Sequence, residues 1–499
     1  DGVTDDTTAF TKATNSSIVI PSGTYKITTN VTLNGEVEFL LGGMLSTTSA
    51  IITFNNKIKA PLNKIFNVSA YTSIVVAKTK QQIGYPEWFG AIPNNGSSDC
   101  TPAINNCIKV FDVTEFQSND YYCFSPIVVG VGFKTLQGKT ANTWINVGDC
   151  TRIISTSATY NIIEVGYSSL PTGGINNFMP NTCINDLYLT RSVAPNANYG
   201  AAGILFKYTL YTFVNRCRSN ESLIGFHMLA TCQTHLTDCY AFRSSVASTG
   251  TDYFYGFYLN GNTTIGSGGN ASTYLDKCNA SVGGISPSSF NSSGIYLDAG
   301  FADTFINDFE CVYCRVGINI NGNTSQAGNV NLIIKNPVID VFHFAGIFIN
   351  NTSRTGAIEI IGGYAAPIST ANNTSWGIWC NGSKSALSIT GFQVVGISST
   401  TTGGLNLTNS EGVTAMNNLY TEVNQQGVVI VNSKNCYIAD VIRNSRTATN
   451  AAIKLAGTNS RIKLDCQVSS GNGSAVFGLG YQILETTTGT DTNNIPKLT

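Results

Sequence analysis

A glycine followed by alternating apolar residues recurs from residue 225 onward. Eight such segments occur, and successive glycines are 31, 38, 23, 29, 31, 27 and 23 residues apart. A minimum spacing of 23 residues with variable additions is typical of a solenoid whose coils carry loop insertions. The segments begin at Gly225, Gly256, Gly294, Gly317, Gly346, Gly377, Gly404 and Gly427.

A second strand-like segment with a polar start accompanies the Gly-led segments. It recurs at Thr237, Asp276, Asn307, Asn336, Asn417 and Ala439. Side chains of a strand point alternately to its two faces, and here the alternation sends Phe, Ile, Val, Leu and Cys to one face. A β-sandwich is the weaker alternative, because it would not keep this pair of strands in fixed order eight times. We therefore predict an all-β fold, a right-handed parallel β-helix.

Composition excludes several other classes of protein. The 499 residues have formal net charge −1 and only 11% are charged, so the basic face of a nucleic-acid binder is missing. No segment approaches the roughly 18 uninterrupted apolar residues of a membrane span. With 42% hydrophobic residues, the chain is also unlike a disordered protein. We predict neither a nucleic-acid partner nor membrane insertion.

The fourteen cysteines do not follow the spacing of a metal site. Cys311 and Cys314 form the only C-x-x-C pair, without a second pair in frame. Cys217, Cys239 and Cys278 each lie in a strand-like segment, so we interpret the cysteines as small buried thiols. No cluster of His or Asp repeats at ligand spacing. We expect no metal and no cofactor.

Two related openings precede the solenoid. The segments 2–10 and 96–104 share the pattern Gly-x-x-Asp-x-Thr-x-Ala-apolar, in which Asp and Thr suit the start of a short helix. We divide the chain into a capping region with its connector (1–92), a helix-capped entry (93–180), the main β-helix (181–470) and an end segment (471–499). The chain begins without Met and without a signal peptide, so we interpret it as trimmed or processed.

These openings carry a resemblance to a known family. The segment 1–27, together with Pro86-Glu87-Trp88-Phe89-Gly90-Ala91 and the second opening, resembles the pectate-lyase-superfamily β-helix domain of bacteriophage tailspikes and capsule depolymerases. The resemblance implies a homotrimer at the tail tip of the virion, assembled in the cytoplasm of the bacterial host. It implies cleavage of capsular polysaccharide or O-antigen, and attachment through an N-terminal particle-binding domain that this chain lacks.

Paired carboxylates are the first candidates for catalysis, because glycoside hydrolysis needs one protonated and one ionised carboxyl group. Asn-Thr-Asp and Gly-His-Gly, which occur in pectinases, are absent, which argues against galacturonan hydrolysis. Alignment of the coils places Glu310 and Asp340 outward on adjacent coils, about 4.8 Å apart along the axis and about 6.6 Å along the strand. Alternatively, Glu310 and Asp340 are solvated acids on the rigid outer surface of the coils and have no catalytic role.

Asp298 and Asp303 form a competing pair in the loop after a Gly-led strand. Loops beside a rigid scaffold often carry function, although Asp beside Gly is also a common turn former. Both residues are kept as alternative catalytic candidates.

The outward positions of the Gly-led strands form an aromatic stripe. Rings at the spacing of the coils could stack on sugars, or the stripe could pack against a sister subunit. We predict a substrate-binding surface that comprises His227, Tyr240, Tyr258, Tyr296, Trp379 and Arg218. The stripe itself consists of His227, Tyr258, Tyr296, Asn319, Phe348, Trp379 and Asn406.

Hydrolysis by Glu310 and Asp340 is therefore the favoured function, and two alternatives stay open. A polysaccharide lyase would use a side chain as base and a cation to stabilise the resulting anion. A non-catalytic adhesin would use the aromatic stripe alone. The lyase candidates are His227, His235, His343, Tyr240, Arg218 and Arg243.

Overall fold

The structure is a computed structural model, and its chain forms two compact units. Unit 1 comprises residues 1–168, 179–204 and 212–218, and unit 2 comprises residues 169–178, 205–211 and 219–499. The structure describes residues 3–139, 150–196, 200–244, 252–261, 270–283, 291–298, 301–322, 330–350, 356–367, 374–384, 386–396, 402–423, 426–444, 452–470 and 483–486.

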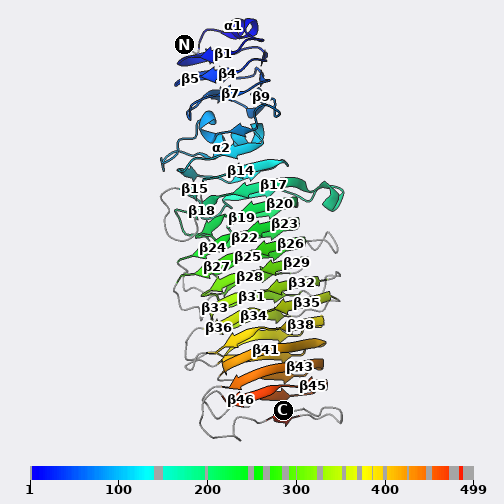
Figure 1. The fold of residues 1–499 in the computed structure, drawn as a ribbon. Coiled ribbons are helices and arrows are strands. Elements are labelled where there is room, and N and C mark those ends of the chain that lie inside the picture. Colours follow the sequence, from blue (N-terminus) through cyan, green and yellow to red (C-terminus); the bar gives the residue numbers. More distant parts are fainter. Residues whose placement is uncertain are drawn as a thin grey trace. The chain divides into compact units, whose positions relative to one another are not determined.

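Unit 1 begins with three small parallel sheets that wind around one apolar interior (Figure 1). Each successive coil adds one strand to each sheet, so that Ile20 pairs with Phe39 and Leu33 pairs with Phe54. These four side chains are 1–2% exposed, because alternate residues of each strand point inward. The strands are β1 (Ile18–Ile20), β2 (Gly23–Lys26), β3 (Val31–Leu33), β4 (Val37–Phe39), β5 (Gly43–Thr47), β6 (Ile52–Phe54), β7 (Ile58–Lys59), β8 (Phe66–Val68) and β9 (Ile74–Val76).

Both predicted helices are present, as α1 (Thr7–Lys12) and α2 (Thr101–Val110). A side-chain oxygen of Asp5 accepts a hydrogen bond from the backbone N–H of the first residue of α1, at 3.0 Å. Asp99 does the same for α2, at 2.9 Å. The shared Asp-x-Thr pattern therefore fixes both helix starts by one arrangement of hydrogen bonds.

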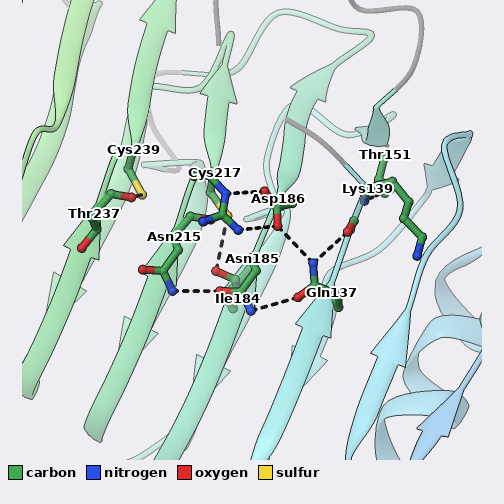
Figure 2. Close-up of polar contacts among 12 residues, drawn as sticks. Gln137, Lys139, Thr151, Ile184, Asn185, Asp186, Asn215, Cys217, Thr237 and Cys239 are labelled. Atoms are coloured by element: carbon green, nitrogen blue, oxygen red, sulfur yellow. Dashed lines mark hydrogen bonds and ion pairs between the residues drawn. The ribbon is translucent and has the colours of Figure 1, made fainter. Parts of the chain in front are cut away.

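The later strands of unit 1 continue the parallel winding. In Figure 2, Asp186 lies at a corner of a coil and accepts hydrogen bonds from Arg216 at 2.7 and 2.8 Å and from Gln137 at 3.1 Å. The elements are β10 (Ile83–Gly84), β11 (Val113–Glu115), β12 (Asp120–Cys123), β13 (Ile127–Val129), β14 (Lys134–Gln137), β15 (Thr151–Ser155), β16 (Ile163–Gly166), β17 (Met179–Asn185), β18 (Leu187–Arg191) and the short helices at Tyr71–Ser73 and Pro86–Phe89.

In unit 2 the Gly-led segments form one parallel sheet, the Gly-led sheet, in which each strand pairs with its counterpart in the next coil. The glycines are required by space: a Cβ on Gly256 would lie 2.5 Å from the carbonyl oxygen of Gly294. The strands are β22 (Ile224–Leu229), β25 (Tyr253–Asn260), β28 (Asn291–Leu297), β31 (Val316–Asn321), β34 (Ala345–Asn350), β37 (Ser375–Asn381), β40 (Thr402–Thr408), β42 (Val428–Val431), β44 (Ile453–Ala456) and β47 (Ile483–Thr486).

Each coil of unit 2 also contributes a first and a second strand, separated by a corner residue. Asp238, Asp308 and Asn336 occupy such corners with φ of 51°, 49° and 48°, a conformation that Asp and Asn tolerate. The first strands are β23 (Cys232–Thr237), β26 (Asn270–Asp276), β29 (Phe301–Asn307), β32 (Val330–Lys335), β35 (Gly356–Ile361) and β38 (Ala386–Thr390). The second strands are β24 (Tyr240–Arg243), β27 (Asn279–Val282), β30 (Glu310–Val312), β33 (Val338–Phe342), β36 (Tyr364–Pro367) and β39 (Gln393–Val395).

Further along unit 2, the strands are β41 (Val413–Val423), β43 (Lys434–Asn444), β45 (Ser460–Leu464) and β46 (Gln467–Ser470). The residues of β19 (Ala202–Lys207), β20 (Thr209–Asn215) and β21 (Arg218–Asn220) are divided between the two units. A short helix, Gly174–Asn177, belongs to unit 2.

All fourteen cysteines lie in the described part of the chain and are free thiols. Twelve are buried, and Cys183 and Cys232 are half-buried. Several donate to the carbonyl oxygen two residues earlier, as Cys217 does to Asn215 at 3.5 Å and Cys239 does to Thr237 at 3.4 Å (Figure 2). The cysteines thus act as small core residues that also satisfy a carbonyl near the corner.

The predicted parallel β-helix is confirmed, and its interior is filled by the inward residues of the strands. The division at residues 92, 180 and 470 stays a prediction, and most of the end segment, 471–482 and 487–499, lies outside the described residues. Within the described ranges, no helix is long and apolar enough to cross a membrane.

Candidate functional site

A groove lies on the outward face of four first strands of unit 2, β26, β29, β32 and β35. Its volume is about 420 Å³ and it combines aromatic, amide and carboxylate side chains. It is lined by Ser272, Tyr274, Asp303, Phe305, Asn331, Leu332, Ile333, Ala357 and Glu359.

An aromatic stack ends at this groove. His235, Tyr274 and Phe305 occupy equivalent positions on successive strands, and their rings are stacked with centroids 4.3 and 4.8 Å apart. The next residue in register is Ile333, followed by Glu359. Because Ile333 carries no ring, the stack stops at Phe305, and both side chains line the groove. This change from rings to a shorter side chain accounts for the groove.

Asp303 points outward because of a local change in the backbone of β29. Its φ is 48°, and this left-handed residue interrupts the alternation of the strand. Ala302 and Asp303 are therefore both half-buried between the buried residues Phe301 and Thr304. Asn331, on the adjacent strand, donates a hydrogen bond of 2.9 Å to Asp303 Oδ1. The carboxylate is thus held at the rim of the groove.

The groove brings together two carboxylates, Asp303 and Glu359. Register places Glu359 opposite Ile333, whereas Asp303 lies beside Asn331. Asp303 and Glu359 are therefore two strands apart across the sheet and two residues apart along the strand direction. Ordinary strand spacings then give about 12 Å between their Cα atoms. The carboxyl groups of two residues with this Cα spacing reach the roughly 6.5–9.5 Å separation of inverting glycosidases only if their side chains lean toward one another.

The predicted pair Glu310 and Asp340 has the expected register. Glu310 is opposite Val338, and Val312 is opposite Asp340, so the two acids are one rung and two positions apart. Both are half-buried on second strands. Asp340 Oδ1 accepts a hydrogen bond from the backbone N–H of Val341 at 2.9 Å. Neither residue lines the groove.

Asp298 and Asp303, predicted as a pair, have separate partners. Asp298 accepts hydrogen bonds from Tyr258 Oη at 3.1 Å and from Asn321 Nδ2 at 3.5 Å, whereas Asp303 contacts Asn331. Ala299 and Gly300, which connect them, lie outside the described residues. The structure therefore assigns Asp303 to the groove and Asp298 to the Gly-led sheet.

The predicted aromatic stripe is one column of the Gly-led sheet, in unbroken register. Its members are half-buried apart from Asn406, which is buried. His227 stacks on Tyr258 at 4.7 Å, and Tyr258 packs against Tyr296 at 5.4 Å. Neighbouring rings thus pack against Tyr258 from both sides, and its role in binding sugars stays a prediction. Edges and hydroxyl groups remain for contact.

The other two predicted binding residues lie elsewhere. Tyr240 is 7% exposed, and its hydroxyl group shares a hydrogen bond of 2.7 Å with Ser281 Oγ. Arg218 belongs to unit 1, where its guanidinium lies 5.3 Å from the centre of the Tyr188 ring. Neither side chain lines the groove.

Three of the side chains considered for a lyase, His227, His343 and Arg243, are half-buried or buried. Burial lowers the pKa of His227 and of His343 to about 4, which leaves little basicity at neutral pH. Burial and the charge of Asp298 raise the pKa of Tyr258. Arg243 is 3% exposed and forms a buried ion pair with Asp252 at 2.8 and 2.9 Å.

Sequence reasoning missed Glu359, Tyr274, Phe305 and Asn331. A signal for most of the groove was present, because its central column always lies three residues before the corner. His235, Tyr274, Phe305, Ile333 and Glu359 precede Asp238, Lys277, Asp308, Asn336 and Gly362 by this distance. Among the described residues, no group of three or more His, Cys, Asp or Glu could hold a metal ion.

No model of a known protein family and no curated protein matches the chain. Solved structures do match in fold. Tailspike protein 3 of bacteriophage CBA120 has a TM-score of 0.55 at 14% identity, over 84% of this chain and 61% of that one. This chain therefore spans less than two thirds of the length of that tailspike.

Two further structures are similar. A mutant tailspike protein of E. coli bacteriophage HK620, in complex with a pentasaccharide, has a TM-score of 0.57 at 11% identity, over 79% of this chain and 77% of that one. The catalytic unit of a GH87 α-1,3-glucanase from Streptomyces thermodiastaticus has a TM-score of 0.51 at 14% identity, over 78% and 68%. The predicted likeness to tailspike β-helices is thus confirmed for the fold.

Proposed function

We propose that this protein is a depolymerase that hydrolyses glycosidic bonds of a bacterial capsular polysaccharide or O-antigen. The observation that carries the proposal is that Asp303 and Glu359 line one groove together with the aromatic side chains Tyr274 and Phe305. A glycosidase needs two carboxyl groups on opposite sides of the scissile bond and a surface that orients the sugar. The fold shared with tailspikes and a glucanase supports this proposal.

The two carboxyl groups have different surroundings, which suggests their roles. Asn331 donates a hydrogen bond to Asp303, an arrangement that suits a carboxylate acting as general base. Glu359 would then be the general acid. Glu359 gives its proton to the glycosidic oxygen as the bond from that oxygen to the anomeric carbon breaks. A water molecule attacks the anomeric carbon from the other side and gives its proton to Asp303, so each cut adds one water and inverts the anomeric configuration.

The pair Glu310 and Asp340 is the second candidate centre. Its register would also allow two carboxyl groups to face one bond. The groove is favoured because it combines a hollow, aromatic side chains and two carboxylates.

We further propose that three copies assemble into a tailspike on the virion, as the likeness to phage tailspikes suggests. Sedimentation equilibrium of the purified protein is expected to give three times the chain mass of 53.1 kDa. A mass of one chain would contradict the trimer.

The function is tested by incubating the protein with capsular polysaccharides and O-antigens of candidate hosts. Mass spectrometry of the products is expected to show one added water per cut, and NMR of fresh products an inverted anomeric configuration. Unsaturated products lighter by that water would establish a lyase and contradict the proposal. Binding without cleavage across the panel would instead establish an adhesin.

A further inference from the structure

A second polar surface lies on the Gly-led sheet around Asp298. Two columns of side chains run side by side there, because outward residues on one strand are two positions apart. The first column is the aromatic stripe. The second contains Asn260, Asp298, Asn321, Asn350 and Asn381, and we call the two columns together the ladder face.

Hydrogen bonds connect the two columns. Tyr258 donates to Asp298, Asn260 Nδ2 donates to Tyr258 Oη at 3.0 Å, and Asn321 Nδ2 donates to Tyr296 Oη at 3.1 Å. The amide of Asn381 continues the second column by donating to Asn350 Oδ1 at 3.1 Å. Stacked rings and mutual hydrogen bonds fix these side chains, so little conformational freedom is lost when a ligand binds.

We propose that the ladder face is a second binding site for the polysaccharide, which holds the polymer beyond the cleavage site. The proposal rests on the proposed function. The hydroxyl groups of Tyr258 and Tyr296 and the carboxamides of the second column lie on strands about 4.8 Å apart, and they match the donors and acceptors of sugar hydroxyl groups. Only five positions separate Asp298 from Asp303, so their Cα atoms are at most about 18 Å apart. One polymer chain can therefore reach both surfaces.

The ladder face is suited to binding and not to cleavage. Asp298 is the only carboxylate in its two columns, whereas hydrolysis requires two. Its neighbour Tyr258 has a raised pKa and is a poor base.

Charge favours a hydrated glycan over a second copy of the chain as the occupant. Two neutral side chains, Tyr258 and Asn321, donate hydrogen bonds to Asp298. A dry protein interface would have to remove this carboxylate from water, and the cores of interfaces are depleted of charge. A glycan instead offers hydroxyl donors to the carboxylate.

The experiment compares the full polymer with the shortest oligosaccharide that the protein still cleaves. The double variant Tyr258→Phe/Tyr296→Phe keeps both rings and removes both hydroxyl groups, and Asp298→Asn removes the charge. The matched control is Tyr313→Phe, which removes an exposed hydroxyl outside the ladder face. Equal circular dichroism and unfolding midpoints establish that the variants fold.

We expect the ladder variants to raise KM for the polymer about tenfold, the effect of losing one or two charged or neutral hydrogen bonds. Their kcat, and both constants for the oligosaccharide, should stay within twofold of the unmodified protein. An unchanged KM for the polymer would overturn the proposal. An equal loss of activity on the polymer and on the oligosaccharide would also overturn it, because it would place cleavage at the ladder face. A change in oligomer mass would show that the face binds another copy.

A different variant tests the proposed function independently of the ladder face. If Glu359→Gln cleaves the oligosaccharide as fast as the unmodified protein does, the groove is not the centre of hydrolysis, whatever the ladder variants do.

Discussion

The groove and the ladder face lie on different strands of the same coils. They differ in the residue that interrupts each column of aromatic rings. On the first strands the stack ends at Phe305, and the shorter Ile333 leaves a hollow beside two carboxylates. On the Gly-led sheet Asn319 interrupts the rings, which resume at Phe348 and Trp379, and Asp298 accepts hydrogen bonds from Tyr258 and Asn321. A repeated scaffold thus acquires distinct chemistry through substitutions within a column, while the backbone register stays the same.

The largest effect should come from the groove carboxylates. We expect Asp303→Asn and Glu359→Gln each to lower kcat by about 10² to 10⁴-fold, because each removes a group that moves a proton in the transition state. The matched variants Glu310→Gln and Asp340→Asn should stay within twofold. Reducing-end assays under saturating polymer measure these changes. If kcat falls in the Glu310 and Asp340 variants and not in the groove variants, the catalytic centre lies on the second strands.

A smaller effect is expected from Phe305→Ala. Removing this ring, which lines the groove, should raise KM about tenfold, in line with the value of an aromatic contact and its buried area. His235→Ala removes a ring of the same stack that does not line the groove, and its KM should stay unchanged. Equal effects of the two variants would mean that the stack only stabilises the fold.

Asn331→Ala should have a still smaller effect. The variant removes the hydrogen bond that positions Asp303, so kcat should fall about fivefold, the equivalent of one neutral hydrogen bond, without a change in KM. Asn350→Ala, on the ladder face, is the matched control and should leave kcat unchanged. A rise in KM alone would show that Asn331 contacts the substrate and does not position the base.

His227, on the ladder face, should make the stability of the fold depend on pH, without an effect on activity at neutral pH. The pKa of His227 is about 4 in the folded protein and about 6.5 in an unfolded chain. Between these values the unfolded state binds more protons, so the free energy of unfolding falls as pH decreases from about 6.5 to about 4. His227→Phe keeps a ring against Tyr258 and should reduce this slope. Denaturant unfolding at several pH values measures this slope, and an unchanged slope would contradict a His227 that stays neutral in the folded protein.

The sequence was sufficient to predict the coils, because spacing, strand alternation and corner residues all follow from one repeat. It also predicted the register of Glu310 with Asp340 and the column from His227 to Asn406. It could not predict which column becomes a groove. The left-handed position before the column recurs at Gln233, Ser272 and Asp303, and only Asp303 places a carboxylate there. The groove also depends on Ile333 after Phe305, which has no meaning until the first strands are aligned on their corners.

Ring orientation was likewise beyond the sequence. A column of His227, Tyr258 and Tyr296 is compatible with faces turned toward a ligand or toward one another, and side-chain packing along the axis selects the second arrangement. The position of Tyr240 illustrates the same point, since an outward place on a strand is still covered by the neighbouring residues.

The most direct test of the central claim is a crystal structure of the Glu359→Gln variant with an oligosaccharide of the cleaved polymer. We predict that one sugar ring lies against Phe305, with the scissile bond between residue 359 and Asp303. An oligosaccharide bound across Glu310 and Asp340, with the groove empty, would contradict this account.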